Sequence, residues 1–523
     1  MTRHTDTPPI IQGGMGVGVS NWCLARAVSL RGQLGVVSGT GIELAVVRRL
    51  QDGDIGGHIR RAMEAFPIRS VTSDVLRRYF RPEGRPEGTP YKLIPMYKQV
   101  VSAARQQLSV ISGFVEVYLA KEGHDGLVGM NLLTKIPLPN LPTLYGAMLA
   151  GVDCILMGAG IPRDIPGSLD RMAEHQPAAI QFEVEGLRDG SAEYVRFDPQ
   201  EHWDETPPRI ARPKFYPIVA SNSLATFMAR KATGTIEGLI VEGPTAGGHN
   251  APPRGEQRLN HRGEPIYGAR DVVDLGKIRD LGFPFWVAGS AGRPERLAEV
   301  QAVGATGIQV GTLFAYCDES GIAEDIKRSV LSHAARGEVD VRTDPRASPT
   351  GYPIKVVDWP ADPAIGVPRQ RICDLGYLRT AYMTPKKKIG FRCPSEPIED
   401  YVKKGGNRED TQGRRCLCNS LIATIGHPQV RDDIGVEPPV VTSGDELENI
   451  GKFLAGRTRY TADDVLDYLL SQQPVPAVES PLAVEAPALR NNGRNGPAGD
   501  RLVRDGRHAG ALRSGGPAGG NRE

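Results

Sequence analysis

Aromatic residues and long hydrophobic runs are both scarce in this sequence. Phe, Trp and Tyr make up 6% of its 523 residues. A membrane-spanning helix needs about 20 predominantly apolar residues, and no uninterrupted run of that kind occurs. Residues 1–10 also contain no apolar core of a secretion signal. We therefore expect no membrane span and a cytoplasmic protein.

An excess of one charge sign is also missing. The 63 basic and 61 acidic residues leave a formal net charge of +2. A surface that coats nucleic acid needs a clear excess of Lys and Arg. We therefore expect neither nucleic acid nor a membrane among the partners.

Cysteine is infrequent, with seven residues in the chain. An odd number without a secretion signal indicates thiols that are free or bound to metal. Four of them cluster late in the sequence, at Cys373, Cys393, Cys416 and Cys418. Four thiolates could hold zinc, but the spacing of Cys416 and Cys418 is not that of a usual zinc knuckle. Buried free thiols are the expectation, and no metal site is predicted.

Short apolar runs that end in Gly or Ser recur along the chain, most of them separated by helix-like stretches. They cover residues 9–14, 34–39, 127–132, 154–158, 215–221, 238–243, 285–289 and 307–312. Continuous apolar strands are typical of parallel sheets that are buried on both faces. Eight strands that alternate with helices close a (β/α)8 barrel, although an open doubly wound sheet also explains the alternation.

The α/β pattern divides the chain into three parts. We expect a TIM-type (β/α)8 barrel over residues 8–320, with long insertions at 41–125 and 160–213 that lie over its active face. A mostly helical C-terminal extension is predicted over residues 321–472. Residues 473–523 lack aromatic side chains and are rich in Ala, Pro, Gly, Asn and Arg, which predicts a disordered tail.

Two glycine-rich turns, one βα unit apart, predict a phosphate site. Gly289 ends the seventh apolar run and Gly292 follows it, and Gly311 and Thr312 end the eighth. In barrels, the loops after strands seven and eight often bind phosphate through backbone N–H groups at a helix start. Each turn alone would be an ordinary strand end, but the pair favours phosphate binding.

A histidine lies in the glycine-rich loop after the sixth run. The loop reads Ala246-Gly247-Gly248-His249. Because the pKa of histidine lies near neutrality, His249 is a candidate general acid or base. A surface histidine that only hydrogen-bonds a neighbour explains the spacing equally well.

Polar and small residues also follow the first three runs. Glycines occur within residues 12–18 and 38–41, and Asn131 ends the third run. A glycine-lined surface suits a planar cofactor that lies on the backbone, with Asn131 hydrogen-bonding its polar edge. The alternative is that these glycines only turn the chain.

With these motifs, residues 8–320 resemble the nitronate monooxygenase (2-nitropropane dioxygenase) family of FMN-dependent barrels. They are also similar to the enoyl-reductase proteins of polyunsaturated fatty acid synthases. The most specific parts are the Ala246–His249 loop and the paired phosphate turns. The resemblance implies FMN as cofactor and His249 as the active-site histidine. It implies cofactor contacts at Gly14, Met15, Asn131, Ser221, Gly247, Gly248, Gly289, Gly292, Gly311 and Thr312.

The resemblance implies an FMN-dependent oxidoreductase that oxidises alkyl nitronates with O₂ to a carbonyl compound and nitrite. The same residues would serve an NAD(P)H-dependent enoyl (acyl carrier protein) reductase that acts with a fatty acid or polyketide synthase. A third alternative is a non-catalytic flavin-binding partner of a synthase. The expected partners are therefore a small-molecule or acyl substrate, with NAD(P)H and a synthase or carrier protein in the reductase alternative.

Overall fold

The structure is a computed structural model that describes residues 7–188, 190–365, 369–431 and 435–471. All of these residues belong to one compact unit, Met1–Pro487. The tail predicted to be disordered, residues 473–523, lies outside the described residues.

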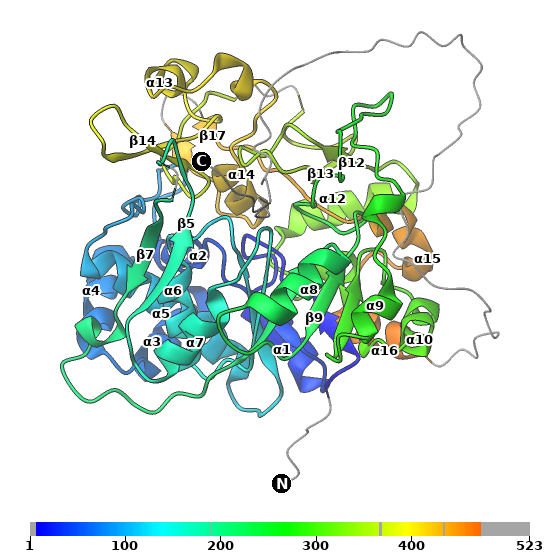
Figure 1. The fold of residues 1–523 in the computed structure, drawn as a ribbon, viewed down its shortest axis with the longest axis horizontal. Coiled ribbons are helices and arrows are strands. Elements are labelled where there is room, and N and C mark those ends of the chain that lie inside the picture. The colour runs from blue at the N-terminus through cyan, green and yellow to red at the C-terminus, as the bar shows by residue number, and fades with distance from the viewer. Residues whose placement is uncertain (1–6, 189, 366–368, 432–434, 472–523) are drawn as a thin grey trace, which may run out of the picture. The chain divides into compact units, whose positions relative to one another are not determined.

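Eight parallel strands surround the centre of this unit (Figure 1). They are β1 (Ile10–Gln12), β2 (Gly35–Ser38), β3 (Val128–Leu133), β4 (Cys154–Gly158), β8 (Lys214–Val219), β9 (Leu239–Glu242), β10 (Phe285–Ala288) and β11 (Gly307–Val310). Their order in the sheet is β1-β11-β10-β9-β8-β4-β3-β2. A parallel bridge between Ile11 and Leu34 joins the two ends of the sheet. The predicted (β/α)8 barrel is therefore confirmed.

Apolar side chains fill the barrel interior. The cluster consists of Ile11, Leu34, Val36, Cys154, Leu156, Tyr216, Ile240, Trp286 and Ala288. Neighbouring positions on the same strands face the surrounding helices instead, because successive side chains of a strand point to opposite faces. The indole N–H of Trp286 donates to the Pro8 carbonyl at 2.9 Å, which satisfies the one polar group of that side chain. The barrel is thus a packed core, and a ligand has room only at its ends.

Helices pack around the strands. They are α1 (Trp22–Leu30), α6 (Asn140–Leu149), α8 (Asn222–Lys231), α9 (Leu275–Arg279), α10 (Pro294–Ala302) and α11 (Thr312–Ala315). The first insertion adds α2 (Ile42–Gln51), α3 (His58–Ala65), α4 (Arg69–Tyr79) and α5 (Ala103–Lys121). Helix α5 lies close against α6, since a Cβ on Gly146 would stand 1.8 Å from the Val110 carbonyl oxygen. The insertion therefore thickens the helical layer outside the barrel.

The second insertion contains α7 (Ile165–Ala173) and three short strands. Strands β5 (Ala178–Phe182) and β7 (Glu193–Phe197) pair antiparallel. Strand β6 (Val184–Glu185) pairs in parallel with β14 (Thr380–Met383) of the C-terminal extension. This pairing ties the second insertion to the extension.

The described part of the extension combines helices with short antiparallel strand pairs. Its helices are α12 (Glu324–Ala335), α13 (Ile398–Lys403), α14 (Leu417–Thr424), α15 (Ile450–Leu454) and α16 (Ala462–Leu470). Its pairs are β12 (Asp340–Asp344) with β13 (Ile354–Asp358), β14 with β15 (Ile389–Arg392), and β16 (Val430–Arg431) with β17 (Gly435–Val436). None of the helices formed by the described residues combines the length and apolar character that a membrane span requires.

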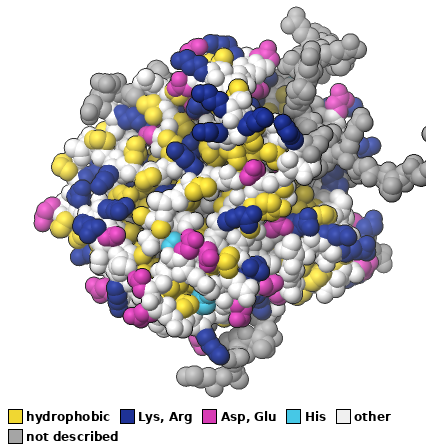
Figure 2. Space-filling model, turned by 60° about the vertical axis from the view of Figure 1, so that its left-hand side comes forward, with side chains coloured by type: hydrophobic (Ala, Val, Ile, Leu, Met, Phe, Trp, Pro, Cys, Tyr) yellow, Lys and Arg dark blue, Asp and Glu magenta, His cyan; other side chains and the backbone are white. Residues whose placement is uncertain are grey.

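Charged side chains of both signs are spread over the face of the molecule that Figure 2 shows. In Figure 2, Lys and Arg side chains lie among Asp and Glu side chains, with hydrophobic side chains between them. This mixture agrees with the near balance of charge in the sequence.

Candidate active site

A cavity of about 220 Å³ lies at the carboxyl ends of the barrel strands. This is the end at which barrel enzymes place their active sites. Most of the predicted site residues line it, namely Gly14, Met15, Asn131, Gly247, Gly248, His249, Gly289, Gly311 and Thr312. The structure thus brings together residues that lie up to about 300 positions apart in the sequence.

Two predicted residues are not part of this cavity wall. Ser221 caps helix α8, and its Oγ accepts a hydrogen bond from the Leu224 N–H at 3.0 Å. Gly292 lies in the turn before α10, where its N–H donates to the carboxylate of Glu446. The role of Ser221 in this structure is therefore a helix cap, and the Gly292 amide already has an acceptor.

The glycine at position 14 allows a close approach between β1 and β3. A Cβ on Gly14 would stand 2.1 Å from the Cβ of Asn131, far inside van der Waals contact. The neighbouring Met15 is held by its own N–H, which donates to Ser20 Oγ at 2.9 Å. The Asn131 side chain can therefore sit at the cavity only because residue 14 has no side chain.

Several residues of the cavity wall have a buried polar atom without a hydrogen-bond partner among the described residues. They include Thr40, at Oγ1, and Gln309, at Oε1. Buried polar atoms are nearly always hydrogen-bonded in folded proteins. These atoms therefore indicate a ligand with polar edges, and the flavin ring of FMN fits that requirement.

His249 bridges the barrel loop and the extension. Its Nε2 lies 2.6 Å from Oγ of Ser348, a fully buried residue. The backbone on either side is also fixed, because the Asn250 N–H donates to the Pro353 carbonyl and the Lys355 N–H to the Gly248 carbonyl, both at 2.9 Å. Burial, aided by the charge of Lys135, holds the pKa of His249 well below its ordinary value. The imidazole is therefore neutral at neutral pH.

Glu242 is a titratable residue of the cavity that the sequence analysis did not select. It ends β9, beside Ala288 of β10, which in turn lies beside Gln309 of β11. Burial raises the pKa of Glu242 to about 7, against the opposing effect of Lys135. An acidic residue at the carboxyl end of a predicted strand was the signal that could have identified it.

Lys135 is the second titratable group that was missed. Its amine is buried without a hydrogen-bond partner among the described residues and lies 4.4 Å from the centre of the Tyr352 ring. Burial lowers the pKa of Lys135 to about 7. Lys135 and Glu242 therefore both change charge close to neutral pH, next to a neutral His249.

The extension, rather than the insertions, provides the outer wall of the cavity. We predicted that residues 41–125 and 160–213 would lie over the active face. Beyond Gly41, no described residue of these insertions lines the cavity. The extension contributes an apolar surface of Ile354, Leu378, Leu417, Cys418 and Leu421. The first insertion packs on the side of the barrel, as the contact of α5 with α6 shows, and the second insertion pairs with β14 of the extension.

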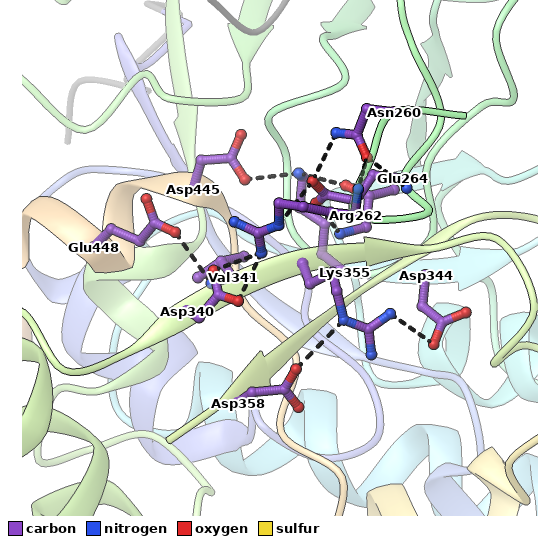
Figure 3. Close-up of polar contacts among 12 residues, drawn as sticks. Asn260, Arg262, Glu264, Asp340, Val341, Asp344, Lys355, Asp358, Asp445 and Glu448 are labelled. Carbon is purple, nitrogen blue, oxygen red and sulfur yellow. Dashed lines mark hydrogen bonds and ion pairs between the residues drawn. The ribbon is translucent and has the colours of Figure 1, made fainter. Parts of the chain in front are cut away.

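A segment of the extension also reaches the predicted phosphate turns. We call residues 442–446 the strap. The Gly444 N–H donates to Thr312 Oγ1 at 3.2 Å, and the Asp445 N–H donates to the Thr245 carbonyl at 3.2 Å. Figure 3 shows that the β12–β13 pair also holds the strap, since Lys355 Nζ of β13 lies 2.6 Å from Asp445 Oδ1. The strap thus lies against the strand ends that would bind phosphate.

The late cysteines converge on a small cavity next to this site. Cys373, Cys393, Cys416 and Cys418 all line it, and Cys418 also lines the main cavity. Burial raises the pKa of the Cys416 and Cys418 thiols. Within the described ranges, no group of three or more His, Cys, Asp and Glu side chains is arranged to hold a metal ion.

The fold and the cavity define a (β/α)8-barrel protein with a cavity at the carboxyl ends of its strands. Residues 210–347 match the family model of nitronate monooxygenase. The matched segment contains β8 to β11, the loop with His249 and both phosphate turns. The match confirms the resemblance to that family and supports an oxidoreductase. No match was found among curated protein sequences.

Solved structures show similarity over most of the chain. FabK from Thermotoga maritima is 17% identical and covers 89% of this chain and 92% of its own, with a TM-score of 0.42. Nitroalkane oxidase from Streptomyces ansochromogenes is 16% identical over 88% of this chain and 94% of its own, with a TM-score of 0.39. The enoyl reductase domain of MlnA from Bacillus amyloliquefaciens is 12% identical over 89% of this chain and 94% of its own, with a TM-score of 0.39.

Proposed function

We propose that the protein is an FMN-dependent oxidoreductase of the nitronate monooxygenase type, which oxidises alkyl nitronates with O₂ to a carbonyl compound and nitrite. One observation carries the proposal: a single cavity joins His249 to the glycine-rich ends of β1, β9, β10 and β11. The family match over residues 210–347 supports the same reaction class.

FMN, when bound, supplies the electron transfer between substrate and O₂. The ring would lie on Gly14 and Met15, with Asn131 at its polar edge and Gly247 and Gly248 beside it. The unpartnered atoms of Thr40 and Gln309 would find hydrogen-bond partners there. The phosphate would be held by the amides of Gly289, Gly292 and Gly311 and by the hydroxyl of Thr312. Ser221 would keep its place as a helix cap behind this site.

His249 would act directly on the substrate. Its Nε2 is engaged by Ser348, so Nδ1 is the ring nitrogen left to face the cavity. A neutral imidazole can accept a proton from a neutral nitroalkane, or its N–H can donate a hydrogen bond to a nitro group. The low pKa of His249 keeps it in this neutral form at neutral pH.

A second candidate function is NAD(P)H-dependent reduction of an enoyl thioester. The apolar wall that Ile354, Leu378, Leu417 and Leu421 add to the cavity favours it. A small nitronate needs no such wall, whereas an acyl chain would bury its methylene groups against it. His249 would then donate a hydrogen bond to the thioester carbonyl.

Two assays on the flavin-loaded protein separate these functions. Nitrite release from ethyl nitronate under air supports the first, and oxidation of NAD(P)H stimulated by an enoyl thioester supports the second. His249→Asn should lower the active rate by about 10²-fold while flavin stays bound. A flavin-loaded protein that shows no activity in either assay contradicts both enzymatic functions. That result would favour a non-catalytic, flavin-binding partner of a synthase.

A further inference from the structure

A carboxylate of the extension lies at the turn that would bind the FMN phosphate. The Gly292 N–H donates to Oε1 of Glu446. Glu446 also lines the main cavity, the space that a ligand would enter. A Cβ on Gly292 would stand 2.9 Å from Glu446 Oε2, so a side chain at this position would have to shift the carboxylate.

The turn has the geometry of an anion site. Gly289 and Ser290 both adopt left-handed conformations, with φ of 93° and 46°. The chain then enters α10, a nine-residue helix that begins with Pro294. Such a turn directs backbone N–H groups and the positive end of the helix dipole toward an anion. The bound Glu446 carboxylate is the second observation that identifies it as a site for oxyanions.

Glu446 has few partners for a partly buried acid. Among the described residues, no Lys, Arg or His side chain forms an ion pair with it, and the hydrogen bond to its carboxylate comes from the Gly292 N–H. Burial raises the pKa of Glu446 to about 7, with the Gly292 amide and the charge of Arg293 opposing that effect and Asp445 adding to it. A partly buried carboxylate with so few partners is costly to keep ionised. An anion that makes more contacts could therefore replace the Glu446 carboxylate at the Gly292 N–H.

The strap that carries Glu446 is itself well fixed. Asp445 pairs with Lys355, and the Gly444 N–H donates to Thr312 Oγ1. A Cβ on Gly247 would stand 2.7 Å from the Gly444 nitrogen, so strap and active-site loop are in close contact. Three residues predicted to touch the cofactor, Gly247, Gly292 and Thr312, therefore already contact the strap.

We propose that Glu446 competes with the cofactor phosphate for the Gly292 amide and thereby sets the affinity of the site for FMN. A phosphate and a carboxylate repel each other at such short range, so both cannot occupy the turn. FMN binds when its phosphate displaces the Glu446 carboxylate. The inference rests on the proposed function, because it takes FMN as the ligand of the main cavity.

The experiment titrates the full-length protein, after removal of bound flavin, with FMN and with riboflavin, and follows the quenching of flavin fluorescence. Riboflavin has the same ring and no phosphate. In Glu446→Ala the Kd for FMN should fall about tenfold, while the Kd for riboflavin stays within about twofold. Glu446→Gln, which keeps the size and an acceptor oxygen, should also bind FMN more tightly because the charge is gone.

The matched control is Glu295→Gln. Glu295 is an exposed acid in the first turn of the same helix α10, so this variant makes the same charge change outside the cavity. Its Kd for both flavins should equal that of the wild type. Unchanged thermal melting of each variant shows that the fold is intact.

The outcomes separate this inference from the proposed function. Wild-type protein that binds FMN with the same Kd as both Glu446 variants overturns the inference and leaves the proposed function standing. Equal tightening of FMN and riboflavin also overturns it, because the effect would not involve the phosphate. If neither wild type nor variant binds either flavin, both proposals are wrong. FMN binding that is gained only in the Glu446 variants supports the inference.

Discussion

Nε2 of His249 and Oγ of Ser348 lie 2.6 Å apart, which joins the active-site loop of the barrel to the C-terminal extension. The two residues are 99 positions apart in the sequence. Ser348 Oγ also lies 2.8 Å from Thr350 Oγ1, so the hydroxyl is itself oriented. The extension therefore helps to build the candidate active site as well as to enclose it.

Ser348→Ala tests this relationship. Loss of the hydroxyl releases the His249 ring, and we expect kcat to fall about tenfold with a smaller change in KM, because orientation and not substrate binding is lost. Steady-state kinetics with the active substrate measure both constants. Ser73→Ala, at an exposed hydroxyl on α4, is the control and should behave as the wild type. A kcat for Ser348→Ala equal to that of the wild type would contradict the role of Ser348.

Lys135→Met should shift the acidic limb of the pH–rate profile. Burial lowers the pKa of His249 first, and the charge of Lys135 lowers it further. Because the lysine charge disfavours the imidazolium, its removal raises the pKa of His249. The acidic limb should therefore move to higher pH in the variant. Lys214→Met, a change at an exposed residue, is the control and should leave the pH–rate profile unchanged. If the acidic limb does not move in Lys135→Met, Lys135 does not act on His249.

Glu242→Gln should stabilise the protein at alkaline pH. The pKa of Glu242 is raised from 4.5 to about 7 in the folded protein, so folding favours its protonated form. The stabilisation of the folded protein by protonation of Glu242 is fully present below pH 4.5 and is lost as the pH rises through about 7. Glutamine cannot ionise, so the variant should melt roughly 2–4 °C above the wild type at pH 8, and at nearly the same temperature at pH 4.5. A gain of equal size at both pH values would rule out ionisation as its cause.

Gly14→Ala should weaken flavin binding without unfolding the barrel. The added methyl group would collide with Asn131 and push its side chain out of position. We expect at least about a tenfold loss of FMN affinity, measured by fluorescence titration. Gly268→Ala is the control, because a Cβ there meets nothing within 4 Å. Full FMN affinity in Gly14→Ala would exclude the cofactor from this part of the cavity.

The sequence was sufficient to predict the barrel and the position of the cavity. Each apolar run formed a strand, and the residues that follow parallel strands necessarily meet at one end of the barrel. Gly14, Asn131, His249 and Gly311 could therefore be brought together before the structure was known. Glu242 could have been added by the same rule.

The contribution of the extension could not be predicted in this way. Glu446 meets Gly292 across 154 positions, and Ser348 meets His249 across 99. The extension has short strands and helices without a repeating βα order, so its periodicity does not indicate where it packs. For the same reason the insertions, which follow strand ends, were predicted over a face that the extension covers instead.

The central claim is that the cavity holds FMN, and the flavin content of the purified protein tests it most directly. The absorbance spectrum of the full chain, as purified or after incubation with FMN and removal of the excess, should show oxidised flavin at about one FMN per chain. Denaturation should release FMN and not FAD or riboflavin. A colourless protein that cannot be reconstituted with FMN would contradict the account.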